Sequence, residues 1–334
     1  LPIYVGPAAL RVRGGGRTFD LDVDDGTRHR GREVNRQASF PTTEDWATVR
    51  VPFADLETTA HGEPVSVDPL DRSGIQTLGI YIAEGSDADV VKALQEEAGS
   101  WFGKGMFEAA YIPEIFYAAA AMNYAPIGEI LPSEHNKFSM AIRRPMGVVS
   151  VVSPWNFPVL LTARGIAFAL SAGNTVVLKP SEETPYCGGL LFAEIFEDAG
   201  IPGGVLNVVT CSRENVAVVG NELVENPLVK GISFTGSTAV GRQIAARAGA
   251  HLKKCCVELG GKDALIICDD ADMDRATRAA NFGSFMHQGQ ICMSVEKILV
   301  QENVFTEFLE RFIERAAKLK VGDPSKDNSH IIGP

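Results

Sequence analysis

The composition of the chain changes near residue 90, and this change constrains how the polypeptide can fold. Residues 1–90 contain no Lys, Cys or Met, although all three residue types occur in the rest of the 334-residue chain. A compositional bias that belonged to one domain would extend through the whole domain. The change near residue 90 therefore indicates two different segments. The length agrees with at least two folded segments, because a domain usually holds about 100–200 residues.

Short apolar runs separated by turn sequences fill the segment before this boundary. Such runs lie at residues 9–12, 18–23, 46–52 and 77–83, with GGG at 14–16 and DDG at 24–26 between them. Alternating runs with regular turn signals are typical of antiparallel strands. We therefore predict a β-sandwich for this segment.

Continuous apolar runs and helical patterns follow the boundary. Residues 87–102 and 114–124 have helical periodicity, whereas VVSVV at 148–152 and NTVVL at 174–178 are continuous β-type runs rich in valine. Strands that are buried on both faces have this composition, and they occur in parallel sheets with crossover helices. An α/β fold is therefore predicted after residue 90.

Composition excludes several classes of function. The net charge of −11 gives no attraction to a phosphate backbone, so nucleic-acid binding is not expected. No apolar run approaches the roughly 20 residues of a membrane span. The six cysteines form no CxxC pair, which predicts a reducing, cytoplasmic location. The six histidines show no HxxxH or HExxH spacing, so no metal site is expected.

Four short motifs after residue 90 carry the functional signal. They are SPWNFP at 153–158, LKPSEETP at 178–185, GISFTGSTAVGR at 231–242, and the pair VELGGKD at 257–263 and GQIC at 289–292. Their order and spacing resemble the aldehyde dehydrogenase superfamily over about residues 92–334. The resemblance implies a Rossmann-like NAD domain with part of the catalytic domain.

The turn after the run at 231–236 has the properties of an anion site. A strand there meets a helical pattern, where unpaired backbone N–H groups and the helix dipole favour a phosphate group. Gly236 and Gly241 are spaced as GxxxxG and not as the usual GxGxxG, so an ordinary helix N-cap is the alternative. The resemblance implies that this turn binds a nicotinamide dinucleotide.

Lys179 and Glu182 follow a buried-looking strand and resemble the pair that holds the adenosine ribose in the family. A carboxylate accepts from ribose hydroxyls and repels a 2′-phosphate, so NAD is expected, with NADP as the alternative. A solvated turn would also fit these residues alone. The cofactor residues that the resemblance implies are Ser153, Trp155, Lys179, Ser181, Glu182, Phe234, Thr235, Gly236, Ser237, Val240, Leu259 and Gly260.

The resemblance also implies a catalytic set of Cys292, Glu258 and Asn156. A Cys292 thiolate would add to an aldehyde carbonyl, and the Asn156 amide and the Cys292 backbone N–H would bind the resulting oxyanion. Loss of hydride leaves a thioester, which Glu258 would hydrolyse by activating water. The residues around Glu258 predict an apolar setting for this base.

Other interpretations of these residues remain open. Lone cysteines are usually small buried hydrophobic residues, and this is our prediction for the other five. His287 lies five residues before Cys292 and could form a Cys–His pair. No hydrolase signature accompanies the pair, so we predict a structural histidine.

The resemblance further implies an oligomerisation strand pair at residues 136–147, and hence a homo-oligomer in the intact family. FGSFMHQGQICMS resembles the vanillin and benzaldehyde dehydrogenase branch, which implies a small aromatic aldehyde as substrate. We predict an NAD-binding domain at 91–258 and a catalytic domain at 259–334. Both chain ends are expected to be cut. The first hundred residues of the family and its later Glu-x-Phe-Gly-Pro element are absent from this sequence, which puts activity in doubt.

Residues 5–85 resemble a second family. RVRGGGRTFDLDV, RQASF, EDWATVRVPFADL and GIQTLGIYIA are similar to the complex I intermediate-associated protein 30 family, a jelly-roll-like β-sandwich. Members act as assembly or binding modules, so this resemblance implies no catalytic residue in residues 1–90. Two alternatives to an enzyme follow: a non-enzymatic assembly or binding protein, or an inactive fusion fragment.

Overall fold

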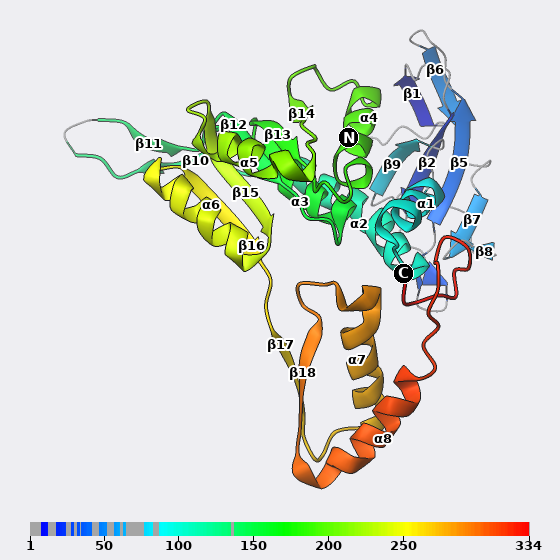
Figure 1. Ribbon diagram of the computed structural model, residues 1–334. Coiled ribbons are helices and arrows are strands. Elements are labelled where there is room, and N and C mark those ends of the chain that lie inside the picture. The colour runs from blue at the N-terminus through cyan, green and yellow to red at the C-terminus, as the bar shows by residue number, and fades with distance from the viewer. Residues whose placement is uncertain are drawn as a thin grey trace. The chain divides into compact units, whose positions relative to one another are not determined.

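The computed structural model describes residues 8–12, 18–24, 28–29, 32–33, 35–41, 47–51, 57–60, 63–64, 77–82, 87–134 and 137–333. The chain divides into two compact units, Leu1–Ser86 and Asp87–Pro334 (Figure 1). The described residues of the first unit lie in strands, and the second unit alternates strands with helices.

Antiparallel strands make up the first unit, as the alternating runs predict. A five-stranded sheet has the order β8-β7-β5-β2-β9, β1 pairs with β6, and β3 pairs with β4. The strands are β1 (Ala8–Val12), β2 (Thr18–Asp24), β3 (Arg28–His29), β4 (Arg32–Glu33), β5 (Asn35–Pro41), β6 (Ala47–Val51), β7 (Glu57–Ala60), β8 (Glu63–Pro64) and β9 (Thr77–Ile82). The stacking of these sheets into a sandwich stays a prediction.

A five-stranded parallel sheet in the order β14-β13-β12-β15-β16 forms the centre of the second unit. Its strands are β12 (Val148–Val152), β13 (Thr175–Lys179), β14 (Leu206–Val208), β15 (Val229–Gly236) and β16 (Lys254–Leu259). The crossover helices are α3 (Pro158–Ser171), α4 (Leu191–Asp198), α5 (Val216–Glu225) and α6 (Thr238–Ala250). This arrangement confirms the predicted α/β fold with a parallel sheet.

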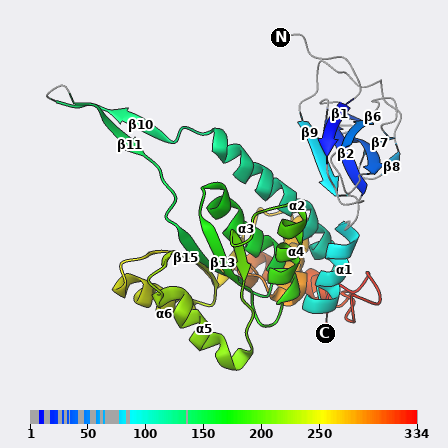
Figure 2. The same ribbon diagram turned by 90° about the horizontal axis from the view of Figure 1, so that it is seen from above.

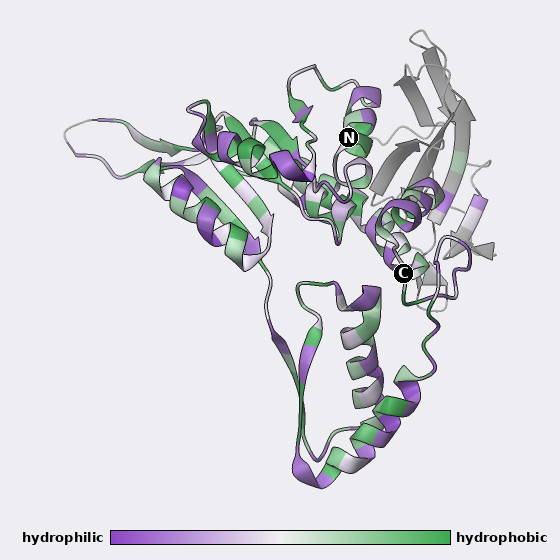
Figure 3. Ribbon diagram, viewed as in Figure 1, coloured by the Kyte–Doolittle hydropathy of each residue, from purple (hydrophilic) through white to green (hydrophobic). Residues whose placement is uncertain are grey.

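The central strand β12 is covered on both faces because its side chains alternate between two hydrophobic clusters. Val149 and Val151 belong to the cluster that contains Ile166 of α3. Val148 and Val152 pack against the other cluster, which contains Phe234 of β15. Figure 3 shows hydrophobic residues gathered on this sheet and on α3. The double burial explains why valines occupy both faces of the VVSVV run.

Helices α1 (Asp87–Ala98) and α2 (Phe102–Ala121) precede the sheet. We predicted a helix from residue 114 onward, but α2 begins at residue 102 and continues through Pro113. Proline inside a helix removes one backbone hydrogen bond and costs about 3 kcal/mol. Ala109, Ile115 and Ala119 of α2 are buried, and this packing offsets the cost.

The α2 helix carries a buried ion pair that meets the start of α3. The Lys104 Nζ and Glu108 Oε1 atoms lie 2.5 Å apart, and both side chains are fully buried. Glu108 Oε2 accepts hydrogen bonds from the backbone N–H groups of Val159 (3.1 Å) and Leu160 (2.9 Å). Burial raises the pKa of Glu108 and lowers the pKa of Lys104, and their mutual attraction opposes both shifts. The carboxylate thus binds two N–H groups that a helix start leaves unpaired.

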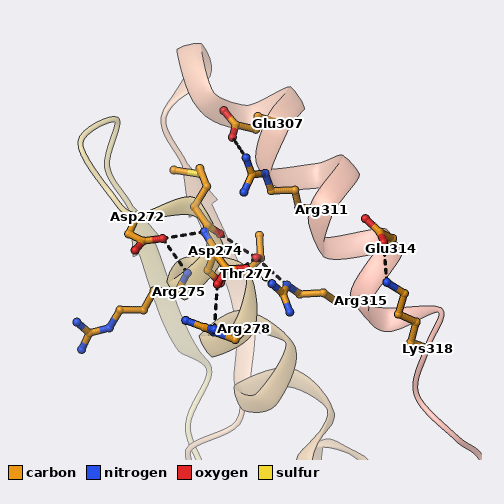
Figure 4. A network of polar contacts seen from close by, with 11 residues as sticks. Asp272, Asp274, Arg275, Thr277, Arg278, Glu307, Arg311, Glu314, Arg315 and Lys318 are labelled. Atoms are coloured by element: carbon orange, nitrogen blue, oxygen red, sulfur yellow. Dashed lines mark hydrogen bonds and ion pairs between the residues drawn. The ribbon is translucent and has the colours of Figure 1, made fainter.

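A smaller α/β layer follows the main sheet. The parallel strands β17 (Asp263–Ile267) and β18 (Val295–Val300) pack with α7 (Met273–Phe285) and α8 (Phe305–Ala316) around Ile267 and Phe308. Arg315 of α8 forms an ion pair with Asp274 of α7, and its Nε donates to Thr277 Oγ1 at 3.0 Å (Figure 4). Packing and polar contacts therefore join α7 to α8.

The remaining elements of the described residues are a hairpin and several short helical segments. β10 (Gly128–Leu131) pairs antiparallel with β11 (Ser139–Ile142), and this hairpin extends away from the sheet (Figures 1 and 2). The short helical segments are η2 (Met122–Tyr124), η3 (Tyr186–Leu190), η4 (Arg213–Asn215), η5 (Met286–Gly289) and η6 (Glu302–Val304).

The predicted segment at residues 136–147 contains only β11, so its start was wrong. β10 has the sequence GEIL, and two apolar residues give too weak a signal to predict a strand. The hairpin side chains are exposed as expected, with Ile130 at 72% and Phe138 at 69%. Within the described residues, no helix is long and apolar enough to cross a membrane.

We expect Glu108→Gln to destabilise the second unit, because it leaves the Lys104 ammonium buried without a counter-charge. Breaking a buried ion pair on one side costs about 3–5 kcal/mol. Urea unfolding followed by circular dichroism should show a clear drop in the midpoint. The matched control is Glu314→Gln, which breaks an exposed pair with Lys318 and should leave the midpoint unchanged. Equal midpoints for Glu108→Gln and the parent would contradict this assignment.

Candidate active site

The carboxyl edge of the parallel sheet gathers the residues that the motifs single out. Ser153 follows β12, Lys179 ends β13, Gly236 ends β15, and Glu258 lies one residue before the end of β16. In the sheet register, Val152 is opposite both Lys179 and Phe234, and Thr235 is opposite Glu258. All four segments therefore emerge from the same edge.

The strand order reverses at this edge. β13 and β14 lie on one side of β12, whereas β15 and β16 lie on the other. Open α/β sheets bind ligands outside the carboxyl ends of the strands at such a reversal. In this sheet the reversal lies between the turn after β12 and the turn after β15.

The turn after β15 forms the start of α6, as predicted. Ser237 is the N-cap, and its hydroxyl accepts a hydrogen bond from the Val240 N–H at 3.4 Å. Both Ser237 and Val240 are exposed. A Cβ at Gly241 would lie 2.3 Å from Leu259 Cδ2, so a glycine lets α6 approach β16 closely. The first N–H groups of α6 thus face the edge where an anion can bind.

Other residues assigned to this turn have mainly packing contacts. The Phe234 side chain is buried in the core cluster of β15 and α6, so only its backbone can face a ligand. Thr235 and Gly236 are half-buried at the end of the strand, and Gly260 is exposed just after β16. The Leu259 side chain fills the space beside Gly241.

The turn after β13 presents one fixed carboxylate. Lys179 is buried, and its Nζ donates to the Pro180 carbonyl oxygen at 2.9 Å and lies 3.6 Å from Glu182 Oε2. The Ser181 hydroxyl is also buried and accepts a hydrogen bond from the Glu183 N–H at 3.2 Å. The lysine therefore holds Glu182 at the carboxyl edge.

These two turns fit a dinucleotide. An anion would be attracted to the N–H groups at the start of α6, and hydroxyl groups would find an acceptor in Glu182. The fit rests on the close packing of Gly241 against Leu259, which gives α6 its place beside the sheet, and on the partly exposed Glu182 carboxylate.

The turn after β12 has both packed and exposed parts. The Ser153 hydroxyl is buried and lies 2.6 Å from the Thr162 hydroxyl of α3. Trp155 is 40% exposed, so its ring is available at the edge. Asn156 comes next, and its side-chain Nδ2 donates to the backbone carbonyl of Gln290 at 2.9 Å. This hydrogen bond joins residues 134 positions apart in the sequence and brings the Cys292 loop to the edge.

The chain after β16 reaches the same loop. β17 and β18 are parallel with Asp263 opposite Val295, so the segment after Glu258 and the segment after Cys292 start side by side. A Cβ built on Gly261 would lie 3.7 Å from the Cys292 carbonyl oxygen. The backbone just after Glu258 thus lies beside the Cys292 backbone, and the Asn156 side chain is bonded to the same loop.

The observed exposure of Glu258 and of the cysteines can be compared with the burial that their sequence context predicts. Glu258 is exposed, so the apolar setting predicted from its neighbours is wrong. Cys292 is exposed, as a nucleophile must be to meet a substrate. The prediction that the other cysteines are buried is correct for Cys187 and wrong for Cys256 and Cys268, which are exposed. Exposure of a thiol alone therefore does not identify the nucleophile.

His287 is fully buried behind this site, at the start of η5. Its ring meets the Phe157 ring edge to face with centroids 5.7 Å apart. Burial and the nearby Lys104 ammonium lower the pKa of His287 to about 3, and a hydrogen bond to the Asn156 backbone opposes this shift. The motif analysis missed this link and the Lys104–Glu108 pair, because their partners lie far apart in the sequence.

Within residues 87–134, 137–333 and the described strands of the first unit, no group of three or more His, Cys, Asp or Glu side chains could hold a metal ion.

Comparison with protein families identifies two matched regions. The aldehyde dehydrogenase family model matches residues 68–334, and the complex I intermediate-associated protein 30 (CIA30) model matches residues 6–99. Both predicted resemblances are confirmed. We expected the first match to begin near residue 92, but it begins at residue 68. The two matches therefore overlap at residues 68–99, which include α1.

Several relatives of this chain are named for aromatic aldehydes. Benzaldehyde dehydrogenase YfmT of Bacillus subtilis is 44% identical over 270 residues, covering 80% of this chain and 55% of the relative. Vanillin dehydrogenase of an Amycolatopsis species is 47% identical over 332 residues, covering 89% of this chain and 67% of the relative. The chain therefore spans about half to two thirds of the length of these relatives.

Solved structures show the same fold. A salicylaldehyde dehydrogenase from Pseudomonas putida G7 complexed with salicylaldehyde is 40% identical with a TM-score of 0.72, covering 75% of this chain and 52% of that chain. An NAD-dependent benzaldehyde dehydrogenase from Corynebacterium glutamicum is 40% identical with a TM-score of 0.68, covering 74% of this chain and 54% of that chain.

The neutral state of buried His287 should make the folded protein sensitive to acid. The pKa of His287 is about 3 in the folded protein and 6.5 in a solvated histidine, so only the unfolded chain binds this proton between those values. The stabilising contribution is therefore complete above about pH 6.5 and is lost as the pH falls. We expect the melting temperature of the parent to fall more steeply than that of His287→Phe between about pH 6.5 and pH 4.5. Parallel melting curves for the two proteins would refute this expectation.

Proposed function

The chain belongs to the aldehyde dehydrogenase family, and we propose that it oxidises an aldehyde to a carboxylic acid with NAD as electron acceptor. The observation that carries this proposal is the hydrogen bond from Asn156 to the Gln290 carbonyl. It places an amide donor beside the loop of the exposed Cys292 thiol, at the same sheet edge as Glu258.

The proposed reaction begins at Cys292. Its thiol proton passes to Glu258, and the sulfur forms a bond to the carbonyl carbon of the aldehyde, giving a thiohemiacetal oxyanion. The C–H electron pair then leaves that carbon as the C=O bond re-forms, and a thioester remains on Cys292. Glu258 releases the first proton to solvent and then takes a proton from water, and the oxygen of the water attacks the thioester carbon. The C–S bond breaks, which releases the carboxylic acid and returns the thiolate.

Asn156 is suited to bind the oxyanion because a side-chain amide has two N–H donors. One of them is used in the 2.9 Å hydrogen bond to the Gln290 carbonyl. That bond orients the amide, and the second N–H is left for the substrate oxygen. A donor held in place before the reaction stabilises the developing charge without reorganising.

NAD, when bound, would supply the nicotinamide ring that accepts the hydride. The N–H groups at the start of α6 would bind its pyrophosphate, with Ser237 and Val240 exposed beside them. Glu182, held by Lys179, would accept from the ribose hydroxyls. Trp155, Ser153, Ser181, Thr235, Gly236, Leu259, Gly260 and the backbone of Phe234 would complete the wall of this site.

The proposed substrate is a small aromatic aldehyde. Relatives that are 38–47% identical are named for vanillin, benzaldehyde and salicylaldehyde. We also propose a cytoplasmic homo-oligomer in which the exposed β10–β11 hairpin pairs between subunits. Its apolar side chains and free strand edges support this role.

The match of residues 6–99 to the CIA30 family supports a second candidate, a non-enzymatic assembly or binding role for the first unit. We propose a jelly-roll-like β-sandwich for residues 1–90, followed by the NAD-binding domain at 91–258 and the catalytic domain at 259–334. Co-purification of respiratory-complex subunits with a Cys292→Ala chain would favour the assembly role. Recovery of this chain alone would count against it.

Replacing the nucleophile tests the enzymatic proposal. With benzaldehyde, vanillin or salicylaldehyde as substrate, Cys292→Ala should lower NADH formation by at least about 10³-fold, because no thioester can form. NAD binding measured by calorimetry should not change. Cys268→Ala removes another exposed thiol and serves as the matched control with parental activity. Unchanged NADH formation in Cys292→Ala would refute the mechanism.

Replacing Glu182 tests the choice of cofactor. Glu182→Gln removes the negative charge that disfavours a 2′-phosphate, so the affinity for NADP should rise by about tenfold relative to NAD. Calorimetric titration with both dinucleotides measures this ratio. Glu183→Gln changes the neighbouring carboxylate, which pairs with Arg213, and should leave the ratio near its parental value. An unchanged ratio in Glu182→Gln would remove Glu182 from the site.

A further inference from the structure

We propose that a pocket beside α7 is a second ligand site, which binds a small aromatic carboxylate. An acid of this class is the product of aromatic aldehyde oxidation, so the role of the pocket as a product site rests on the function proposed above. The binding of the acid does not depend on that function, because the pocket uses none of the proposed catalytic residues.

The size and the walls of the pocket suit one aromatic ring. Its volume is about 140 Å³, and an apolar cavity of about 150 Å³ accepts benzene. Trp101, Phe282 and Phe285 supply three aromatic side chains to the wall. Aromatic rings prefer to pack edge to face or with an offset against one another, so these side chains favour an aromatic ligand.

One face of α7 carries most of this wall. Arg278, Asn281, Phe282 and Phe285 have the spacing i, i+3, i+4 and i+7, which places their side chains on the same face of the helix. The Phe282 side chain is 58% exposed. A ring bound in the pocket would therefore remove apolar surface from water.

Trp101 adds its indole from the residue before α2. A Cβ at Gly103 would lie 2.6 Å from Cη2 of this indole, so the glycine gives the ring room to fold over the first turn of α2. Leu319 and Ile331 of the segment after α8 also line the pocket. Side chains from three parts of the chain thus enclose one apolar space.

The polar part of the wall has a net positive charge. Arg278 Nη1 lies 2.9 Å from Asp274 Oδ2, and Arg315 forms an ion pair with Oδ1 of the same carboxylate (Figure 4). Two guanidinium groups therefore share one carboxylate, which leaves one positive charge. Each guanidinium has five N–H donors, so donors remain for a second carboxylate. A planar guanidinium binds a carboxylate better than it binds a neutral oxygen.

Asn281 supplies a polar group whose oxygen is not in use. Its Oδ1 is buried and has no hydrogen-bond partner among the described residues. The last torsion angle of an asparagine side chain is broad and roughly two-fold, so the amide can turn over. Such a turn breaks no hydrogen bond of Oδ1, and it lets an amide N–H face a carboxylate oxygen in the pocket.

The pocket adjoins the segment that leads to the proposed nucleophile. Met286, which follows α7 and begins η5, is part of the wall. Asn156, Glu258 and Cys292 are not among the residues that line the pocket. An aromatic acid bound here thus contacts the start of the Cys292 loop and leaves the catalytic groups free.

Calorimetric titration of the full chain with benzoate tests the proposal. Benzoate should bind with a Kd below about 1 mM, because it offers both a ring and a charge to the pocket. Benzyl alcohol keeps the ring without the charge, and acetate keeps the charge without the ring, so each should bind at least about tenfold more weakly. Absence of benzoate binding would overturn the proposal, and so would equal affinities for benzoate and acetate.

Substitutions in the wall locate the bound acid. Arg278→Gln should weaken benzoate binding by about tenfold, and Asn281→Leu should weaken it by about threefold. The matched control is Arg311→Gln, which removes a guanidinium of α8 that pairs with Glu307 at the surface, and it should keep the parental Kd. The exposed Arg278 pair adds little to stability, so Arg278→Gln should also keep the parental melting temperature. A parental Kd in Arg278→Gln would overturn the proposal.

Two further variants distinguish failure of this proposal from failure of the proposed function. Cys292→Ala and Asn156→Ala should bind benzoate with the parental Kd whether or not the chain oxidises aldehydes. An inactive parent whose benzoate binding depends on Arg278 would refute the function alone. Benzoate binding that is lost in Asn156→Ala and unchanged in Arg278→Gln would place the acid at the reaction centre and overturn the second site.

Discussion

The start of a helix leaves backbone N–H groups without partners, and in α3 two of them are bound by the buried Glu108 carboxylate. This interaction fixes where α3 begins and therefore how the chain turns after β12. That turn carries Asn156, which in turn holds the Gln290 carbonyl and the loop of Cys292. The geometry of the site thus depends on a charge pair in a helix that contributes no catalytic group.

The parallel sheet sets the second constraint. β12 is covered on both faces, so a slip of one residue would exchange its two sets of valines between the clusters. The register that avoids this slip also aligns the ends of β13, β15 and β16 with the end of β12. Burial of apolar side chains therefore aligns polar residues that are far apart in the sequence. Close packing of α6 on β16 through Gly241 places a helix start beside them.

Local signals in the sequence predict the parts of this fold that depend on local interactions. The valine-rich runs predict β12 and β13, and the Gly236–Ser237 turn predicts the start of α6. Pro113 suggests a helix boundary, yet tertiary packing of α2 overrides it. The exposure of Glu258 and the link from His287 to Phe157 depend on segments that meet only in the folded chain. No local pattern encodes such contacts, so the sequence predicts the motif residues but not the residues that hold them.

The order of these elements along the chain has a consequence for biosynthesis. Translation proceeds from the N-terminus, so α2, α3 and the five strands of the sheet leave the ribosome before Cys292 does. At about 5–20 residues per second, the end of β16 precedes Cys292 by roughly two to seven seconds. The Asn156 turn is then a template onto which the segment with His287 docks. Cys292, the proposed nucleophile, is the last of the proposed catalytic residues to be synthesised, which shortens the time that its thiol spends in an unfinished chain.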